Sequence, residues 1–271
     1  MSLSIMEWNV HQQGGSGKGR VPPFVSEELG GFDVACLTEF CTEGPGRREF
    51  IEDLERRGYA CAVSGNTGGN DVLIAVRSRF PILGCSWEPC RGVDTLPENL
   101  RVDLDRGGGT LSVVGIRIKS LDGVKTLRER NRLRRRQLLW ALDWIKDVEH
   151  PVLLTGDFNS NRRGSDNPDW SMDVMGELLK DHGFRLYTPE GSSVFEERSD
   201  YAEFPYDHFI ARGAEVTGLL YDRDFTGRDP AAYFMGRDFR QPWYPGADAR
   251  ELASVAPPFP DHAILKGTLE F

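Results

Sequence analysis

Apolar residues recur along the chain with two periods, which predict strands and helices in turn. Short alternating or continuous apolar runs, bounded by Gly, Asn and Pro, predict about ten strands. The predicted strands span residues 3–10, 32–40, 59–64, 71–78, 82–87, 100–104, 110–119, 151–155, 206–212, 216–221 and 263–271. The second of them contains Val34, Ala35, Cys36 and Leu37 in succession, a continuous run typical of a strand buried on both faces.

Apolar residues spaced three and four apart predict helices between these strands. The longest predicted helix covers residues 126–148, and its apolar stripe consists of Leu138, Ala141, Leu142, Ile145 and Val148. Shorter helices are predicted at residues 47–57 and 171–182. Helices that alternate with many strands indicate an α/β fold and argue against a pure β-sandwich or a regular βα barrel.

No internal repeat or low-complexity linker divides the 271 residues, so we expect a single domain over residues 1–271. Residues 224–258 have no clear period and exceed the length of an ordinary connection, which indicates a long loop or insertion. The aromatic side chains of this segment could line a substrate cleft, or they could pack on the edge of a sheet. The sequence leaves both interpretations open.

The charge balance restricts the partners that the chain could bind. With 33 Lys and Arg against 42 Asp and Glu, the net charge is −9 at pH 7. Binding to nucleic acid through bulk charge requires a basic surface, so this balance argues against it without excluding a local basic groove.

The cysteines and the hydropathy pattern predict a reduced, soluble, cytoplasmic protein. The five cysteines, Cys36, Cys41, Cys61, Cys85 and Cys90, are odd in number and form no C-x-x-C pair. We expect them to be reduced and mostly packed. No signal-peptide pattern and no apolar run near the ~20 residues that span a bilayer are present, so no transmembrane segment is predicted.

The first candidate for chemistry follows the predicted strand at residues 151–155. Asp157 and Asn159 are two residues apart, and Gly156 precedes the carboxylate. In an extended backbone they would point to the same side, which places a base beside a neutral amide donor. The alternative is an Asx-turn that only closes the strand.

Two of the five histidines directly follow an aspartate at the start of a predicted strand. These pairs are Asp207–His208 and Asp261–His262. Such pairs also occur by chance on surfaces. However, an aspartate from one segment could orient the imidazole of another and fix its tautomer.

Glu39 and Asn9 also stand at the ends of predicted strands. A carboxylate at the mouth of an apolar strand costs desolvation free energy unless it is paired or bound to a metal. Asn9 could instead begin the glycine-rich turn that follows it. Together with Asp157, Asp207 and Asp261, these residues supply oxygen ligands suited to Mg²⁺ or Mn²⁺, without the His and Cys cluster of a zinc site.

In this order the motifs resemble the endonuclease/exonuclease/phosphatase superfamily, also called the DNase I-like fold. The matching segments are Trp8-Asn9-Val10, Leu37-Thr38-Glu39, Gly156-Asp157-Phe158-Asn159, Tyr206-Asp207-His208 and Pro260-Asp261-His262. They extend from residue 8 to residue 262 and so cover nearly the whole chain. The resemblance implies a four-layer α/β sandwich, in which two packed mixed sheets are flanked by helices.

The resemblance also implies cleavage of a phosphate ester with Mg²⁺, or Mn²⁺, as the cofactor. Glu39 would bind the metal directly, and Asn9 and Asp261 would lie nearby and act partly through water. Metal and donors aimed at the phosphoryl oxygens would supply the main electrostatic stabilisation.

Catalytic roles follow from the same resemblance. Asp157 would orient and deprotonate the attacking water, and Asn159 would hold a phosphate oxygen. His262, oriented by Asp207, would donate to the phosphate as charge develops. His208 is expected to support the site rather than to catalyse.

Two positions depart from the family pattern. Arg117 stands in the central strand where many members carry His or Tyr; Arg can clamp a phosphate but cannot act as an acid. His11 stands where some nuclease members carry an Asp. This second departure weakens a two-metal interpretation and an assignment to the DNA-repair nucleases.

Residues 125–136 hold seven basic residues against Glu129, a local net charge of +6. Arg134 and Gln137 match an Arg-x-x-Gln phrase that is frequent in the family. The preferred interpretation of the basic run is a solvated helix face that pairs with the acidic remainder of the chain. The alternative is a contact with a phosphate backbone, whose affinity would fall steeply with salt.

We therefore expect a metal-dependent phosphoesterase, and within this class a phosphodiesterase that uses water as the nucleophile. The substrate could be a small molecule, a lipid or a nucleic acid, so a nuclease is the main alternative. A non-catalytic nucleic-acid-binding member is a third hypothesis. No protein partner is indicated, and the number of metals and the oligomeric state stay open.

Overall fold

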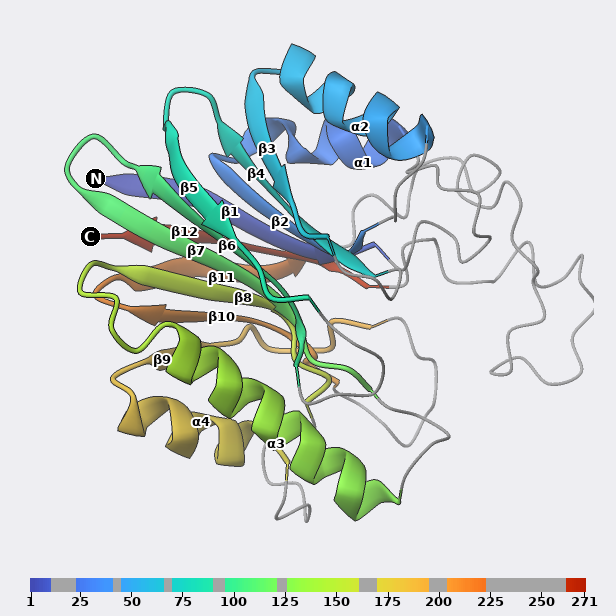
Figure 1. The fold of residues 1–271 in the computed structure, drawn as a ribbon, viewed down its shortest axis with the longest axis vertical. Helices are drawn as coiled ribbons and strands as arrows, with labels where there is room; N and C mark the ends of the chain where they lie inside the picture. The colour runs from blue at the N-terminus through green and yellow to red at the C-terminus, as the bar shows by residue number, and fades with distance from the viewer. Residues whose placement is uncertain are drawn as a thin grey trace, which may run out of the picture.

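The computed structural model describes residues 1–10, 23–40, 45–65, 70–89, 96–120, 126–160, 170–194, 204–222 and 262–271. Within these ranges, twelve strands form two six-stranded sheets (Figure 1). Sheet A has the strand order β11-β12-β1-β2-β4-β3, and sheet B has the order β5-β6-β7-β8-β10-β9. The β1–β2 and β7–β8 pairs are parallel and the other pairs are antiparallel, so both sheets are mixed.

The elements have the following bounds. Sheet A consists of β1 (Ser2–Asn9), β2 (Val34–Phe40), β3 (Tyr59–Val63), β4 (Asp71–Arg77), β11 (Glu215–Asp222) and β12 (Ile264–Glu270). Sheet B consists of β5 (Ile82–Ser86), β6 (Glu98–Asp105), β7 (Thr110–Arg117), β8 (Val152–Asp157), β9 (Arg185–Tyr187) and β10 (Asp207–Arg212). The helices are α1 (Pro23–Glu28), the short 3-10 helix η2 (Leu29–Gly31), α2 (Pro45–Arg56), α3 (Leu127–Trp144) and α4 (Met172–Asp181).

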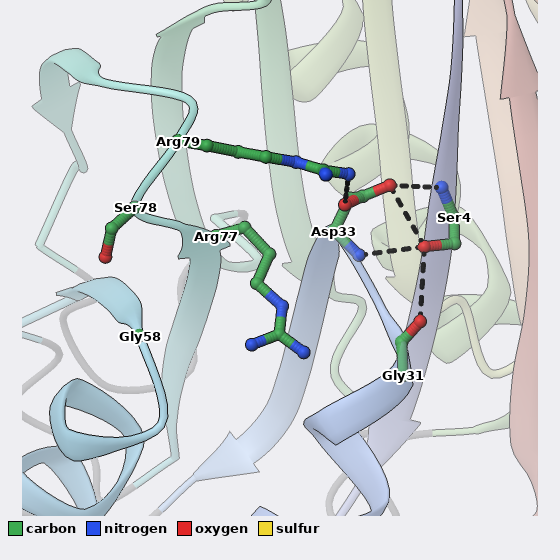
Figure 2. A pocket seen from close by; sticks show the side chains of 7 residues that line it. All are labelled: Ser4, Gly31, Asp33, Gly58, Arg77, Ser78 and Arg79. Atoms are coloured by element: carbon green, nitrogen blue, oxygen red, sulfur yellow. Dashed lines mark hydrogen bonds and ion pairs between the residues drawn. The ribbon is translucent and has the colours of Figure 1, made fainter.

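A polar cluster joins the N-terminal ends of β1 and β2. The Asp33 carboxylate accepts hydrogen bonds from the backbone N–H (3.0 Å) and the hydroxyl (3.1 Å) of Ser4, and it also pairs with Arg79. Arg77 donates to backbone carbonyls of the adjacent turns. These side chains line a pocket of about 530 Å³ (Figure 2). Since its charged groups already have partners within the protein, the pocket shows no group prepared for a ligand.

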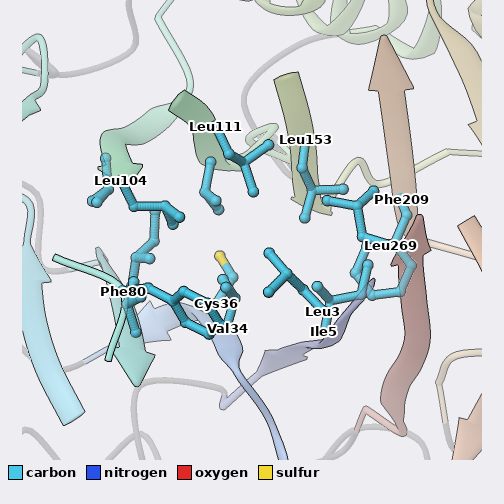
Figure 3. Close-up of a cluster of buried hydrophobic side chains, with 14 of the residues drawn as sticks. Leu3, Ile5, Val34, Cys36, Phe80, Leu104, Leu111, Leu153, Phe209 and Leu269 are labelled. Carbon is cyan, nitrogen blue, oxygen red and sulfur yellow. The ribbon is translucent and has the colours of Figure 1, made fainter. Parts of the chain in front are cut away.

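The two sheets pack face to face around a core of side chains from both. Leu3, Ile5 and Cys36 extend from sheet A toward Leu153 and Phe209 of sheet B (Figure 3). Residues two apart on a strand share a face, so the alternate residues of β1 and β2 face outward. Burial of this apolar surface, at about 25 cal/mol per Å², is the main force that holds the sheets together.

Helices cover the outer faces of both sheets. On sheet A, Leu37 packs with Leu29 of η2 and with Leu54 of α2. On sheet B, Leu138 of α3 and Met175 of α4 pack against the outward side chains of the central strands. The layers are therefore helix, sheet, sheet, helix, which confirms the predicted four-layer sandwich. Burial of β2 on both faces also confirms the interpretation of its continuous apolar run.

The predicted elements differ from the observed ones mainly where the elements are short. The three-residue strand β9 and the six-residue helix α1 were not predicted, because neither is long enough to show a period. The predicted helix at 126–148 does begin after Thr126, whose side chain forms a capping box with Glu129, but it ends at Trp144. The segment 224–258 lies outside the described residues.

Candidate active site

Four charged residues form one row across sheet B. Glu98 of β6 is the cross-strand partner of Arg117 in β7, Arg117 is the partner of Asp157 in β8, and Asp157 is the partner of Asp207 in β10. Cross-strand partners lie on the same face of a sheet. The register therefore places Arg117 between Glu98 and Asp157, and it places Asp157 beside Asp207.

Sheet A contributes Asn9 and Glu39 to the same place. The Asn9 amide Nδ2 donates to Glu39 Oε1 (3.2 Å) and to Asp157 Oδ2 (3.1 Å), and thus connects the two sheets. Glu39 has a φ of 50°, where the register between β2 and β4 also shifts. A non-glycine residue in this region is uncommon and is often associated with function.

Asp157 and Asn159 come together through a turn rather than through an extended backbone. The strand ends at Asp157, and Asn159 has a φ of 46°. Its backbone N–H donates to Asp157 Oδ1 (2.7 Å), which is the predicted Asx-turn. The Asn159 side chain also donates to Asp157 Oδ2 (3.0 Å) and to the Ile118 carbonyl (2.8 Å). The premise of an extended backbone was wrong, yet the turn itself builds the site.

Gly156 allows the carboxylate to be placed here. Its φ is +146°, and a Cβ atom at this position would lie 1.7 Å from the Ile116 carbonyl oxygen in β7. Any side chain would therefore force β7 and β8 apart immediately before Asp157.

The environment of Asp157 suits a general base. Burial, followed by the charge of Asp207, raises the pKa of the Asp157 carboxyl to about 7. His262, Arg117 and the Asn159 backbone amide act in the opposite direction. A base whose pKa lies near neutral pH can be unprotonated and still accept a proton effectively.

Asp207 and His262 form the expected pair across the two sheets. Nδ1 of His262 lies 2.7 Å from Oδ2 of Asp207, and both side chains are buried. The Trp8 indole N–H donates to the His262 carbonyl (2.9 Å) and fixes the backbone behind the ring. The structure thus brings together the His262 and Asp207 side chains that the sequence motifs pointed to.

His208 lies in the interior. Its Nε2 is 2.8 Å from the Ser160 hydroxyl and its Nδ1 is 2.7 Å from the Thr188 hydroxyl. Both ring nitrogens therefore contact groups of the protein. Its supporting role stays a prediction.

Two acidic residues at the site were missed by sequence reasoning. Glu98 holds Arg117 through a 3.0 Å hydrogen bond from Nη1 to Oε2. Glu7 is fully buried and accepts a hydrogen bond from the Thr38 hydroxyl (2.9 Å). Burial, followed by the charge of Asp207, raises the pKa of Glu7 well above its ordinary value.

Signals for both residues were present in the sequence. The hairpin at residues 106–109 sets a register that pairs Glu98 with Arg117. The alternation in the first strand places Glu7 on the same face as Leu3 and Ile5.

The donor set at this end of the sheets suits a hard divalent cation. Oxygen atoms of Asn9, Glu39 and Asp157 are the preferred ligands of Mg²⁺ and Mn²⁺. The described residues contain no cluster of three or more His, Cys, Asp or Glu side chains. Asp261, the further predicted ligand, and His11 lie outside them. Among the described residues, the oxygen atoms of Asn9, Glu39 and Asp157 are therefore of the type that such a cation prefers, and the metal site itself stays a prediction.

The cysteines of the described part take no part in this site. Cys36, Cys61 and Cys85 are free, as predicted, and Cys85 is exposed rather than packed. Cys41 and Cys90 lie outside the described residues. Burial raises the pKa of Cys61 to about 12, so this thiol is not a nucleophile at neutral pH.

The basic helix α3 has two different faces. Arg134 is buried and donates to the Ser120 carbonyl (2.9 Å), and Gln137 accepts from the Lys119 backbone N–H (3.0 Å). Arg132, Arg135 and Arg136 are exposed and form no ion pair with another described residue. Their exposure agrees with a solvated helix face, and the pairing of this face with the acidic remainder stays a prediction.

A family comparison agrees with the geometry. The sequence model described as "Endonuclease/Exonuclease/phosphatase family" matches residues 6–249. The chain belongs to this family. Members of the endonuclease/exonuclease/phosphatase family hydrolyse phosphoesters, which supports a hydrolase here. Comparison with curated proteins gave no significant match.

Solved structures share the fold at low sequence identity. An endonuclease/exonuclease/phosphatase protein from Beutenbergia cavernae DSM 12333 superposes with a TM-score of 0.66 at 16% identity, over 100% of this chain and 72% of that one. Humanized D. rerio TDP2 gives 0.64 at 14% identity, over 100% and 99%. ANGEL2, a 2′,3′-cyclic phosphatase, gives 0.63 at 17% identity, over 99% and 95%. These similarities confirm the DNase I-like fold.

Membrane association by a spanning helix finds no support in the described ranges. None of their helices combines the length and the apolar character needed to cross a bilayer.

Proposed function

We propose that the protein is a Mg²⁺- or Mn²⁺-dependent phosphodiesterase that uses water as the nucleophile. The observation that carries the proposal is the buried Asp157, whose pKa is raised to about 7 and whose direct cross-strand partner is Asp207 of the Asp207–His262 pair. A base and a proton donor thus lie side by side at the ends of strands from two sheets. This arrangement suits attack by water on a phosphorus atom between them.

Each residue then has a defined task. Asp157 accepts a proton from the attacking water, and Asn159 holds the Asp157 carboxylate through two hydrogen bonds. To bind a phosphate oxygen as well, the Asn159 amide has to give up one of its present acceptors. His262, with Nδ1 held by Asp207, donates from its other ring nitrogen to the phosphate.

The cofactor adds charge neutralisation. Glu39, with Asn9 and Asp261 nearby, would hold a divalent cation, which acts as a Lewis acid on the phosphoryl oxygens. Arg117 supplies a second positive charge in the same site, and in the metal-free structure its Nε lies 2.7 Å from Glu39 Oε1. It replaces the His or Tyr of other members as a phosphate contact and not as an acid.

A nuclease is the second candidate, and the exposed arginines of α3 favour it. Arg132, Arg135 and Arg136 could contact a phosphate backbone beyond the cleaved bond. Among the proteins with the same fold, one structure is described as D. rerio TDP2 complexed with single strand DNA product. ANGEL2 is described in complex with adenosine-2′,3′-vanadate. Small phosphodiesters and nucleic acids are therefore the first substrates to test.

The test is an assay panel with Mg²⁺, Mn²⁺ or EDTA. The panel contains nicked and abasic DNA, single-stranded DNA and RNA, 2′,3′-cyclic nucleotides, sphingomyelin and inositol phosphates. We expect metal-dependent product from at least one class, reduced by about 10²-fold or more in Asp157→Ala and His262→Ala.

Asp181→Ala and His182→Ala at the end of α4 serve as matched controls and should retain activity. If no substrate gives a metal-dependent product, or if the two site variants stay active, the protein is not this enzyme. A folded chain that binds nucleic acid without cleaving it would support the non-catalytic alternative.

A further inference from the structure

Arg117 makes two unequal contacts with the carboxylates around it. Its Nη1 donates a hydrogen bond of 3.0 Å to Glu98 Oε2. Its Nε lies 2.7 Å from Glu39 Oε1 and 3.8 Å from Asp157 Oδ2. This buried Nε–H nevertheless makes no hydrogen bond with another described residue. Arg117 is therefore attached to Glu98 by a directed bond and to Glu39 by charge alone.

The fold explains why the two contacts differ. Glu98 and Arg117 are cross-strand partners in one β-hairpin, so their relative position is fixed by the register of β6 and β7. Glu39 comes from β2 in the other sheet. The Arg117–Glu98 pair is thus a unit of sheet B that meets a carboxylate of sheet A.

A guanidinium and a divalent cation cannot both neutralise the same buried carboxylate oxygen without repelling each other. The side chains of Arg117, Glu39 and Glu98 are all largely buried, and that of Arg117 has an exposure of 13%. Water therefore screens the repulsion little, and the two cations compete for the Glu39 carboxylate.

We propose that Arg117 is an exchangeable partner of Glu39, which it neutralises until a divalent cation is bound there. We further propose that Glu98 is the positioning residue that keeps the released guanidinium in the site to bind a phosphoryl oxygen. This inference rests on the proposed function, because it takes Glu39 to be the cation ligand. The buried Nε–H, now without an acceptor, is then a donor ready for the substrate.

The first test measures cation binding rather than activity. Mn²⁺ is titrated into the full chain without substrate, and free Mn²⁺ is followed by electron paramagnetic resonance. Arg117→Gln should tighten Mn²⁺ binding by about tenfold, because the competing charge is gone. Glu98→Gln should weaken it by about threefold, because Arg117 then pairs with Glu39 alone.

A double-mutant cycle separates this exchange from general electrostatics. If Glu98 acts through Arg117, then Glu98→Gln changes Mn²⁺ affinity by less than about twofold once Arg117 is already Gln. If the two effects simply add, Glu98 acts as a distant charge and the positioning role is wrong. Unchanged or weaker Mn²⁺ binding by Arg117→Gln overturns the exchange.

The second test addresses the phosphate contact with inorganic phosphate as the probe. With Mn²⁺ saturating, Arg117→Gln should weaken phosphate binding by about tenfold, although it binds Mn²⁺ more tightly. Equal phosphate affinity in both proteins overturns the proposed contact. Arg101→Gln, which removes the Arg101–Asp103 pair on the neighbouring strand, is the matched control and should change neither affinity.

Folding of the variants is followed by thermal unfolding with and without Mn²⁺. Loss of Arg117 leaves buried carboxylates unpaired, so Mn²⁺ should raise the melting temperature of Arg117→Gln more than that of the wild type. An equal shift counts against the exchange. Should Arg117→Gln fail to fold, Arg117→Lys keeps the charge but cannot bridge two carboxylates, and its Mn²⁺ affinity should respond less to Glu98→Gln.

The outcome also distinguishes this inference from the proposed function. If the wild-type protein binds Mn²⁺ and hydrolyses a phosphodiester, but Arg117→Gln leaves the Mn²⁺ affinity unchanged, only the inference is contradicted. A wild-type protein that binds no Mn²⁺ contradicts both.

Discussion

Nδ1 of His262 lies 2.7 Å from Oδ2 of Asp207, although 55 residues separate them in the chain. Asp207 begins β10 of sheet B, and His262 stands just before β12 of sheet A. The pair therefore forms only when both sheets are packed correctly. It couples the packing of the two sheets to the orientation of one imidazole ring.

Removing the carboxylate of this pair should lower activity without removing the ring. Asp207→Asn can still contact His262, but it no longer stabilises the positive charge of a proton donor. We predict that kcat falls by about 10²–10⁴-fold, because this is the typical contribution of a general acid. His262→Gln should cost about as much, and the double variant should cost little more, because the two residues act as a unit. Steady-state kinetics of the three variants decide this.

His208 provides the control for that prediction. It is buried and contacts the hydroxyls of Ser160 and Thr188, away from the Asp207 carboxylate. His208→Gln should lower the melting temperature and leave kcat within about threefold of the wild type. A loss of kcat as large as that of His262→Gln would show that the wrong histidine has been assigned.

The pH dependence of catalysis should report on Asp157. Burial, followed by the charge of Asp207, raises the pKa of Asp157 to about 7. A general base must be unprotonated, so kcat/KM should increase about tenfold per pH unit below the pKa and level off above it. A bound cation stabilises the carboxylate and should move the inflection to lower pH than in the metal-free protein. NMR titration of Asp157 in EDTA gives the metal-free value, and a carboxyl that titrates near pH 4 contradicts the assignment.

Most of the strands and the position of the motifs could be predicted because both depend on local pattern. Asn9 and Asp157 were placed at strand ends by the apolar runs before them, and these ends are where the structure has them. The division of strands between two sheets could not be predicted. It depends on distant pairings such as Ser2 with Glu270, which no local period records.

For the candidate site, the sequence predicted which residues take part better than it predicted how they are arranged. Glu98 was not predicted because the predicted strand began at residue 100, and Glu7 was not predicted because it lies inside its strand rather than at the end. Register and alternation nevertheless place both side chains inside the fold. The Asx-turn at Asp157 was weighed as the alternative to a catalytic site, yet the turn and the site are one structure. A turn signal beside an acidic residue is therefore compatible with a candidate site at that residue.

Gly156 should be intolerant of even the smallest side chain. A Cβ atom would lie 1.7 Å from the backbone oxygen of Ile116, and the φ of +146° strains any L residue. Gly156→Ala should destabilise the fold by about 4 kcal/mol or more, in the range of severe backbone and packing defects.

The matched control is Gly176 within α4, where a Cβ atom meets nothing within 4 Å. Gly176→Ala should stabilise the protein by about 0.5–1 kcal/mol through helix propensity. Urea unfolding at pH 7 measures both. A Gly156→Ala protein as stable as the wild type would mean that β7 and β8 are not this close.

The buried Glu7 should make the metal-free protein less stable as the pH rises. Burial, followed by the charge of Asp207, raises its pKa well above the ordinary value. Above about pH 4.3 the unfolded chain loses this proton while the folded protein keeps it. The unfolded state then binds fewer protons, so the free energy of unfolding falls with increasing pH until the folded pKa is reached.

Glu7→Gln removes this contribution. Relative to the wild type, the variant should gain stability between pH 4.5 and pH 8 when urea unfolding is measured in EDTA. Asp157 contributes a slope of the same sign up to about pH 7, so part of the dependence should remain in Glu7→Gln. A variant whose stability changes with pH as the wild type does would show that Glu7 is ionised in the fold.

The exposed arginines of α3 decide between a nucleic acid and a small substrate. Arg132, Arg135 and Arg136 lie three and four residues apart, so they share one face of the helix, and all three are exposed. If this face contacts the backbone of a single strand, the affinity should fall with salt with a log–log slope of about −0.7 per contact. Changing all three to Ser should then reduce that slope by about 2 units and weaken binding at low salt.

Changing Arg48, Arg56 and Arg57 on the sheet A side to Ser removes the same charge and serves as the control. A salt dependence that is flat in the wild type, or equal in both triple variants, assigns this face to solvent and leaves a small phosphodiester as the substrate.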